Sequence, residues 1–98
     1  MSARPKPPSG LPNPNNLREV LAYNVRLLRV EQGCSQELLA MKCGLDRTYV
    51  SSVERMKWNV SLSNIETLAH ALGVQAWELL KPPNIDDVSQ ISYLCNSN

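Results

Sequence analysis

Apolar residues recur three and four positions apart through most of this 98-residue chain, and this spacing predicts amphipathic helices. Five helices are expected, over residues 17–32, 35–43, 47–55, 61–72 and 76–80. The expected buried positions of the two longest are Leu17, Val20, Leu21, Val25 and Leu28 in the first helix, and Leu62, Ile65, Leu68, Ala69 and Leu72 in the fourth. The pattern therefore predicts an all-α fold.

Start and stop signals mark the ends of the short central helices. Ser35 and Asp46 each have the side-chain oxygen that an N-cap needs, and Gly44 suits the left-handed residue that ends a helix. The apolar residues expected to pack these two helices together are Leu39, Cys43, Leu45, Val50 and Val53. Two short helices joined by a turn that contains glycine form a helix-turn-helix, whose second helix enters the major groove of DNA.

The caps of the outer helices have alternatives. Asn15 or Asn16 can cap the first helix. The fourth helix can begin at Ser61, or two residues later at Ser63 with Glu66 in a capping box.

Four polar residues of the third helix have no predicted burial role, namely Arg47, Thr48, Ser51 and Ser52. They are expected to face outward near the N-terminal end of that helix, where base edges are read. An arginine can donate two hydrogen bonds to guanine, and a threonine can offer a hydroxyl or a methyl contact to thymine. The sequence therefore assigns base reading to these four residues.

A spaced series of residues between about positions 17 and 80 supports this interpretation. Its members are Val25, Arg26, Arg29, Gly33, Ser35, Gln36, Glu37, Leu39, Ala40, Gly44, Val53, Glu54, Arg55, Ile65, Ala69, Leu72, Gly73 and Val74. The series resembles the Cro and phage-repressor type of helix-turn-helix regulator, the XRE family. The resemblance implies a five-helix, lambda-repressor-like DNA-binding domain with the helix-turn-helix in its second and third helices. A plain helical bundle is the alternative.

The resemblance also implies roles for single residues. In this family an arginine of the first helix pairs with a glutamate near the end of the third, here Arg29 and Glu54. Either charge would be costly if buried alone, so the two are expected to be hydrogen-bonded to each other. The glutamine at the start of the second helix, here Gln36, contacts a DNA phosphate in the family. Relatives often have glycine where this chain has Met56, so Met56 either extends the third helix or carries backbone strain.

Other side chains are expected to reach the DNA backbone. Arg55 and Lys57 are assigned to phosphates, as is Tyr49, for which a place in the core is the alternative. Arg26 faces either solvent or phosphate. Trp58 either packs on the domain or lies against the sugar-phosphate backbone.

The fifth helix indicates how two copies would meet. Trp77, Leu79 and Leu80 present more apolar surface than so short a helix can hide against its own domain. In relatives this region commonly makes the dimer contact, which would place two recognition helices about 34 Å apart along DNA. The alternative is that Trp77 closes the core of the monomer.

The chain divides into three parts. Residues 1–16 are rich in proline and are expected to form a disordered arm, either inert or touching DNA through Arg4 and Lys6. Residues 17–81 form the DNA-binding domain. Residues 82–98 form a tail that either contributes to the dimer edge or stays loose.

Composition narrows the function further. A net charge of +1 does not mark a nucleic-acid binder, so any basic surface must be local. The chain's cysteines, Cys34, Cys43 and Cys95, and its single histidine, His70, have no metal-ligand spacing, so neither metal nor cofactor is expected. Without an apolar run of membrane length or a signal peptide, a cytoplasmic protein is expected.

These observations predict a transcription regulator that binds a palindromic double-stranded operator as a homodimer. An enzyme is not expected, because the chain has no nucleophile–base pairing and no glycine-rich phosphate loop. Residues 45–51 also resemble restriction-modification controller proteins, which is one alternative. Another is an antitoxin-like module whose C-terminal tail binds a partner protein. RNA polymerase is a further possible partner, through the outer face that includes Glu37.

Overall fold

The computed structural model describes residues 8, 10–57 and 59–83. Its elements, in chain order, are α1 (Leu17–Glu31), α2 (Gln36–Cys43), α3 (Arg47–Glu54), α4 (Leu62–Leu72) and the 3-10 helix η1 (Ala76–Leu80). Every element in this part of the chain is helical, as expected. The prediction of five α-helices is wrong for the last, because η1 has only five residues before its C-cap and the prolines that follow.

Caps fix the ends of the two longest α-helices. The Asn16 side chain accepts the N–H of Glu19 at 3.2 Å, and the Ser61 hydroxyl accepts the N–H of Asn64 at 3.1 Å. Asn16 and Ser61 are therefore the N-caps among the alternatives. Gly73 ends α4 in the left-handed conformation with φ 77°. His70, in the last turn of α4, is exposed.

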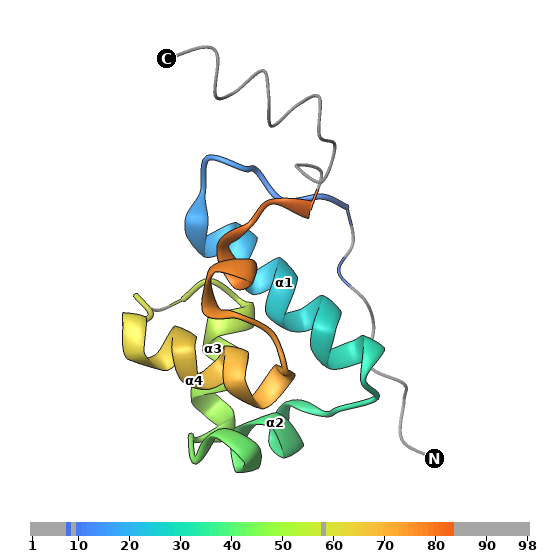
Figure 1. Cartoon of the computed structure of the whole chain (residues 1–98), viewed down its shortest axis with the longest axis vertical. Helices are drawn as coiled ribbons and strands as arrows, with labels where there is room; N and C mark the ends of the chain where they lie inside the picture. The colour runs from blue at the N-terminus through green and yellow to red at the C-terminus, as the bar shows by residue number, and fades with distance from the viewer. Residues whose placement is uncertain (1–7, 9, 58, 84–98) are drawn as a thin grey trace.

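The core lies where all the elements meet. As Figure 1 shows, η1 lies between α1 and α4, and it contacts both. The residues with the most completely buried side chains are Leu39, Leu68, Leu79, Val20, Val25, Val50, Val53 and Cys34. Aliphatic side chains therefore fill the interior, as the low aromatic content predicts. No helix within the described ranges is long and apolar enough to cross a membrane.

Two residues of the predicted stripes lie outside this core. Leu17 is 59% exposed and Leu62 is 76% exposed. Each is the first residue of its helix, and the first buried residues of the two helices are Val20 and Ile65. The sequence pattern identified the correct buried face of each helix, but burial along that face begins about one turn later than predicted.

The described part of the proline-rich segment contacts the start of α1. The N–H of Asn13 donates to the Glu19 carboxylate at 2.9 Å, and the N–H of Asn16 donates to the carbonyl of Asn13 at 3.0 Å. Pro12 is buried. The expectation of a disordered arm over residues 1–16 stays a prediction. Residues 1–7, with Arg4 and Lys6, lie outside the described residues, and so do Trp58 and 84–98 of the tail.

Candidate nucleic-acid interface

The turn between α2 and α3 is fixed by local hydrogen bonds. The Ser35 hydroxyl accepts the N–H of Leu38 at 3.0 Å and so caps α2. Gly44 has φ 68°, the left-handed conformation that ends the helix without a Cβ penalty. Asp46 then caps α3 by accepting the N–H of Thr48 at 2.8 Å. The predicted helix-turn-helix is thus present, with each cap at its expected residue.

The outer face of α3 is narrower than the sequence suggests. Arg47, Thr48 and Arg55 are exposed, and Ser51 is half-buried between them. Ser52 is only 4% exposed, so the expectation that it faces outward to read bases is wrong. The reason is that α3 packs against both α1 and α2, so its buried arc is wide enough to include a small polar residue.

A buried ion pair joins the end of α3 to α1. Arg29 donates from Nε to Oε2 of Glu54 at 2.7 Å and from Nη2 to Oε1 at 2.9 Å. The two side chains are 5% and 2% exposed, respectively. Arg29 also donates from Nη1 to the carbonyl oxygen of Cys34 at 2.9 Å. The predicted pairing of Arg29 with Glu54 is confirmed, with the bidentate geometry that compensates best for burial.

Gln36 is attached to the same ion pair. Its Nε2 donates to Oε1 of Glu54 at 3.1 Å, across the gap between the start of α2 and the end of α3. Sequence reasoning assigned Gln36 to a phosphate and missed this contact. No local spacing could have shown it, because the two residues are 18 positions apart.

The remaining side chains that were predicted to contact the DNA backbone differ in how far they are buried. Lys57 is exposed beyond α3, and Arg26 is half-buried on α1. Tyr49 is half-buried and packs on the core, and its hydroxyl accepts a hydrogen bond from Nδ2 of Asn64 at 2.9 Å. Tyr49 is therefore partly a core residue, as its alternative interpretation proposed. Its phosphate contact, like those of Arg26, Arg55 and Lys57, stays a prediction.

Met56 has the conformation that relatives often give to glycine. Its φ is 60°, the positive value of a left-handed residue, and within the described residues the others with positive φ are glycines. Helix α3 ends at Glu54, so Met56 does not extend it. The alternative in which Met56 carries backbone strain is confirmed.

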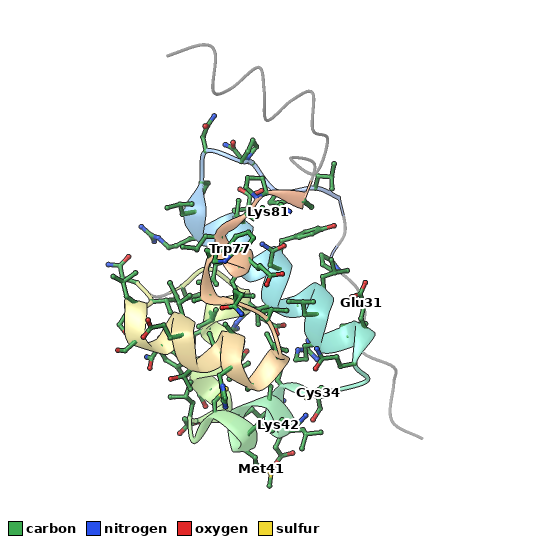
Figure 2. The ribbon with its side chains drawn as sticks, in the orientation of Figure 1. Glu31, Cys34, Met41, Lys42, Trp77 and Lys81 are labelled. Carbon is green, nitrogen blue, oxygen red and sulfur yellow. The ribbon has the colours of Figure 1, made fainter. Side chains whose placement is uncertain are left out.

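The three predicted dimer residues differ in how far they are exposed. Trp77 is 63% exposed, whereas Leu79 is 0% exposed and belongs to the core of its own domain. Leu80 is half-buried and packs on that core. The prediction is therefore wrong for Leu79, because the tight turn of η1 directs it inward. Figure 2 shows Trp77 and Lys81 close together, and the Lys81 Nζ lies 6.0 Å from the centre of the indole ring.

Asn24 holds η1 in place, a role that sequence reasoning missed. It is 7% exposed on α1. Its Nδ2 donates to the carbonyl oxygens of Leu79 at 2.9 Å, Lys81 at 3.0 Å and Glu78 at 3.4 Å. The only signal in the sequence is a polar residue among the apolar positions of the first helix.

The two described cysteines, Cys34 and Cys43, differ in burial. Cys34 is buried and Cys43 is half-buried, and both are free thiols. Burial raises the pKa of the Cys43 thiol, and the nearby Cys34 adds to the shift. Over the described residues, no three His, Cys, Asp or Glu side chains gather as a metal site would need.

Known proteins are similar to this chain in sequence. A family model described as "Helix-turn-helix" matches residues 25–79. The chain is 64% identical over 76 residues to a hypothetical transcription factor of Neisseria meningitidis serogroup B, across 78% of this chain and 72% of that protein. It is 46% identical over 77 residues to the control protein C.BamHI of Bacillus amyloliquefaciens, across 78% of this chain and 95% of the relative.

Two solved structures are similar to this chain in fold. The hypothetical transcription factor NHTF from Neisseria superposes with a TM-score of 0.80 at 61% identity, covering 82% of this chain and 92% of that one. The restriction-modification controller protein C.AhdI from Aeromonas hydrophila superposes with a TM-score of 0.60 at 50% identity. That match covers 61% of this chain and 91% of the controller.

Proposed function

The chain belongs to the XRE-type helix-turn-helix family of DNA-binding transcription regulators, and we propose that it binds a palindromic operator as a homodimer in the cytoplasm. Helix α3 enters the major groove in each half-site. The observation that carries this proposal is the outward stripe of exposed Arg47 and Thr48 and half-buried Ser51 on a short helix. The buried residues of the same helix are Val50, Ser52, Val53 and Glu54. No bond is made or broken in this mechanism.

Base reading falls to the exposed start of α3. Arg47 donates two hydrogen bonds to O6 and N7 of a guanine, and Thr48 contacts the neighbouring base through its hydroxyl or methyl group. Ser51 lies one turn further along the same stripe. Ser52 has no part in base reading, since its side chain is buried.

Phosphate contacts flank this stripe. Gln36 meets a phosphate at the start of α2, where the first backbone N–H groups of a helix are free to bind an anion. Arg55 and Lys57 follow the end of α3, Tyr49 lies on α3, and Arg26 lies on α1. These contacts position the protein on the duplex and contribute affinity for any sequence.

A more specific function is control of a restriction-modification system. Two relatives named for this role support it, the control protein C.BamHI and the restriction-modification controller protein C.AhdI. In this role the operator lies upstream of genes for an endonuclease and a methylase. A chain whose gene has no such neighbours would retain the general function alone.

Selection of bound sequences from a random pool of duplexes tests the proposal. The purified full-length protein is used at near-physiological salt. A palindrome with half-sites about one DNA turn apart is expected. A single unpaired half-site would contradict the dimer, and no enrichment by a folded protein would contradict sequence-specific binding.

A further inference from the structure

Glu54 accepts hydrogen bonds from two helices at once. Arg29 of α1 donates to both of its oxygens, and Gln36 of α2 donates from Nε2 to Oε1 at 3.1 Å. An ionised carboxylate accepts hydrogen bonds and donates none. The amide nitrogen of Gln36, and not its oxygen, must therefore face Glu54. One buried carboxylate thus sets the orientation of the Gln36 side chain.

Arg29 holds the same turn by a second route. Its Nη1 donates at 2.9 Å to the carbonyl oxygen of Cys34, two residues before Gln36. The start of α2 is therefore tied to the ion pair through its backbone as well as through its side chain. The guanidinium also balances the carboxylate charge, which would otherwise repel a phosphate that approaches Gln36.

We propose that Glu54 is a positioning residue for phosphate binding. Together with Arg29 it directs the second amide N–H of Gln36 toward one DNA phosphate, beside the backbone N–H groups of Gln36 and Glu37. The Ser35 side chain accepts only the later N–H of Leu38. The backbone N–H groups of Gln36 and Glu37 therefore have no acceptor within their own helix. Glu54 itself does not touch DNA. The inference rests on the proposed function, which gives Gln36 its phosphate contact.

Ethylation interference on the selected operator tests this role with the full-length protein, because an ethylated phosphate inhibits binding where it is contacted. Gln36→Ala is expected to remove inhibition at one phosphate in each half-site and to weaken binding roughly tenfold. The double variant Arg29→Met, Glu54→Leu replaces the ion pair with apolar side chains, a change that folded proteins often tolerate. It retains Gln36 but is expected to lose inhibition at the same phosphate.

Two further variants separate positioning from general destabilisation. Ile65→Val trims the buried face of α4 away from the ion pair, and it is expected to keep the full interference pattern. Glu54→Gln keeps the shape of the side chain but no longer dictates which end of the Gln36 amide faces it. It is expected to weaken inhibition at that phosphate, and it provides the test if circular dichroism shows that the double variant is unfolded.

The outcomes distinguish the inference from the function on which it rests. If Gln36→Ala removes inhibition at the phosphate but the folded double variant Arg29→Met, Glu54→Leu keeps that inhibition, Glu54 has no positioning role. Unchanged inhibition in a folded Glu54→Gln protein would have the same meaning. If Gln36→Ala itself keeps every position, the phosphate contact assigned to Gln36 is wrong.

Discussion

Arg47 is the residue on which sequence preference should depend most. It is exposed at the first position of α3, and nothing in the fold requires it. Arg47→Ala is expected to cost about 1–3 kcal/mol on the selected operator and little on a scrambled duplex, because the bidentate contact forms only with the correct base. Fluorescence anisotropy titrations on both duplexes measure this. Equal losses on the two would show that Arg47 contacts the backbone instead.

Met56 offers a test of stability at the same scale. A side chain at φ 60° is strained, so Met56→Gly is expected to stabilise the protein by about 1 kcal/mol, less any packing that the methionine side chain provides. Urea unfolding followed by circular dichroism gives the change. Arg55→Gly is the matched control, because Arg55 has φ −97° and should lose about 0.5–1 kcal/mol. Destabilisation by both changes would contradict strain at Met56.

The sequence predicted single residues well where the chemistry is local. Ser35, Gly44 and Asp46 act on neighbours within a few positions, so spacing alone identifies their roles. Ser52 could not be assigned in the same way. Its burial depends on two other helices that close over α3, and a small hydroxyl side chain carries no sign of that packing.

At the scale of elements, Asn24 decides where η1 lies. Asn24→Ala removes the donor shared by three backbone carbonyls, so it is expected to destabilise the domain by about 1–3 kcal/mol. Gln32→Ala is the matched control. Its exposed side chain donates to a single carbonyl, that of Leu72, and the expected loss is at most about 1 kcal/mol. Urea unfolding of both variants checks the ranking, and equal losses would contradict it.

The periodicity of apolar residues predicted where the helices lie. It did not predict that η1 is a 3-10 helix, or which of its side chains are buried. Trp77, Leu79 and Leu80 are all apolar, so the sequence alone predicts that they form one surface. The 3-10 turn and its attachment to Asn24 instead send Leu79 into the core and leave Trp77 outside. The acceptors of Asn24 lie more than 50 positions away along the chain, a distance at which periodicity gives no information.

At the scale of the whole molecule, the exposed Trp77 predicts how two copies associate. A tryptophan 63% exposed on a monomer is a typical anchor of a protein interface. Trp77→Glu is expected to weaken the dimer by about 2 kcal/mol or more, because it places a charge where an aromatic ring would be buried. Sedimentation equilibrium measures the change. Binding to a full palindrome should fall, while binding to an isolated half-site should stay the same.

Met41→Glu is the control that makes the test specific to one surface. Met41 is 72% exposed, and Figure 2 shows it far from Trp77 along the molecule. The same introduced charge at that position should leave dimerisation intact, because the proposed two-fold contact runs through η1. If Met41→Glu dissociates the dimer and Trp77→Glu does not, the two copies meet through α2. The two recognition helices would then have a different spacing, and the selected half-sites would no longer be one DNA turn apart.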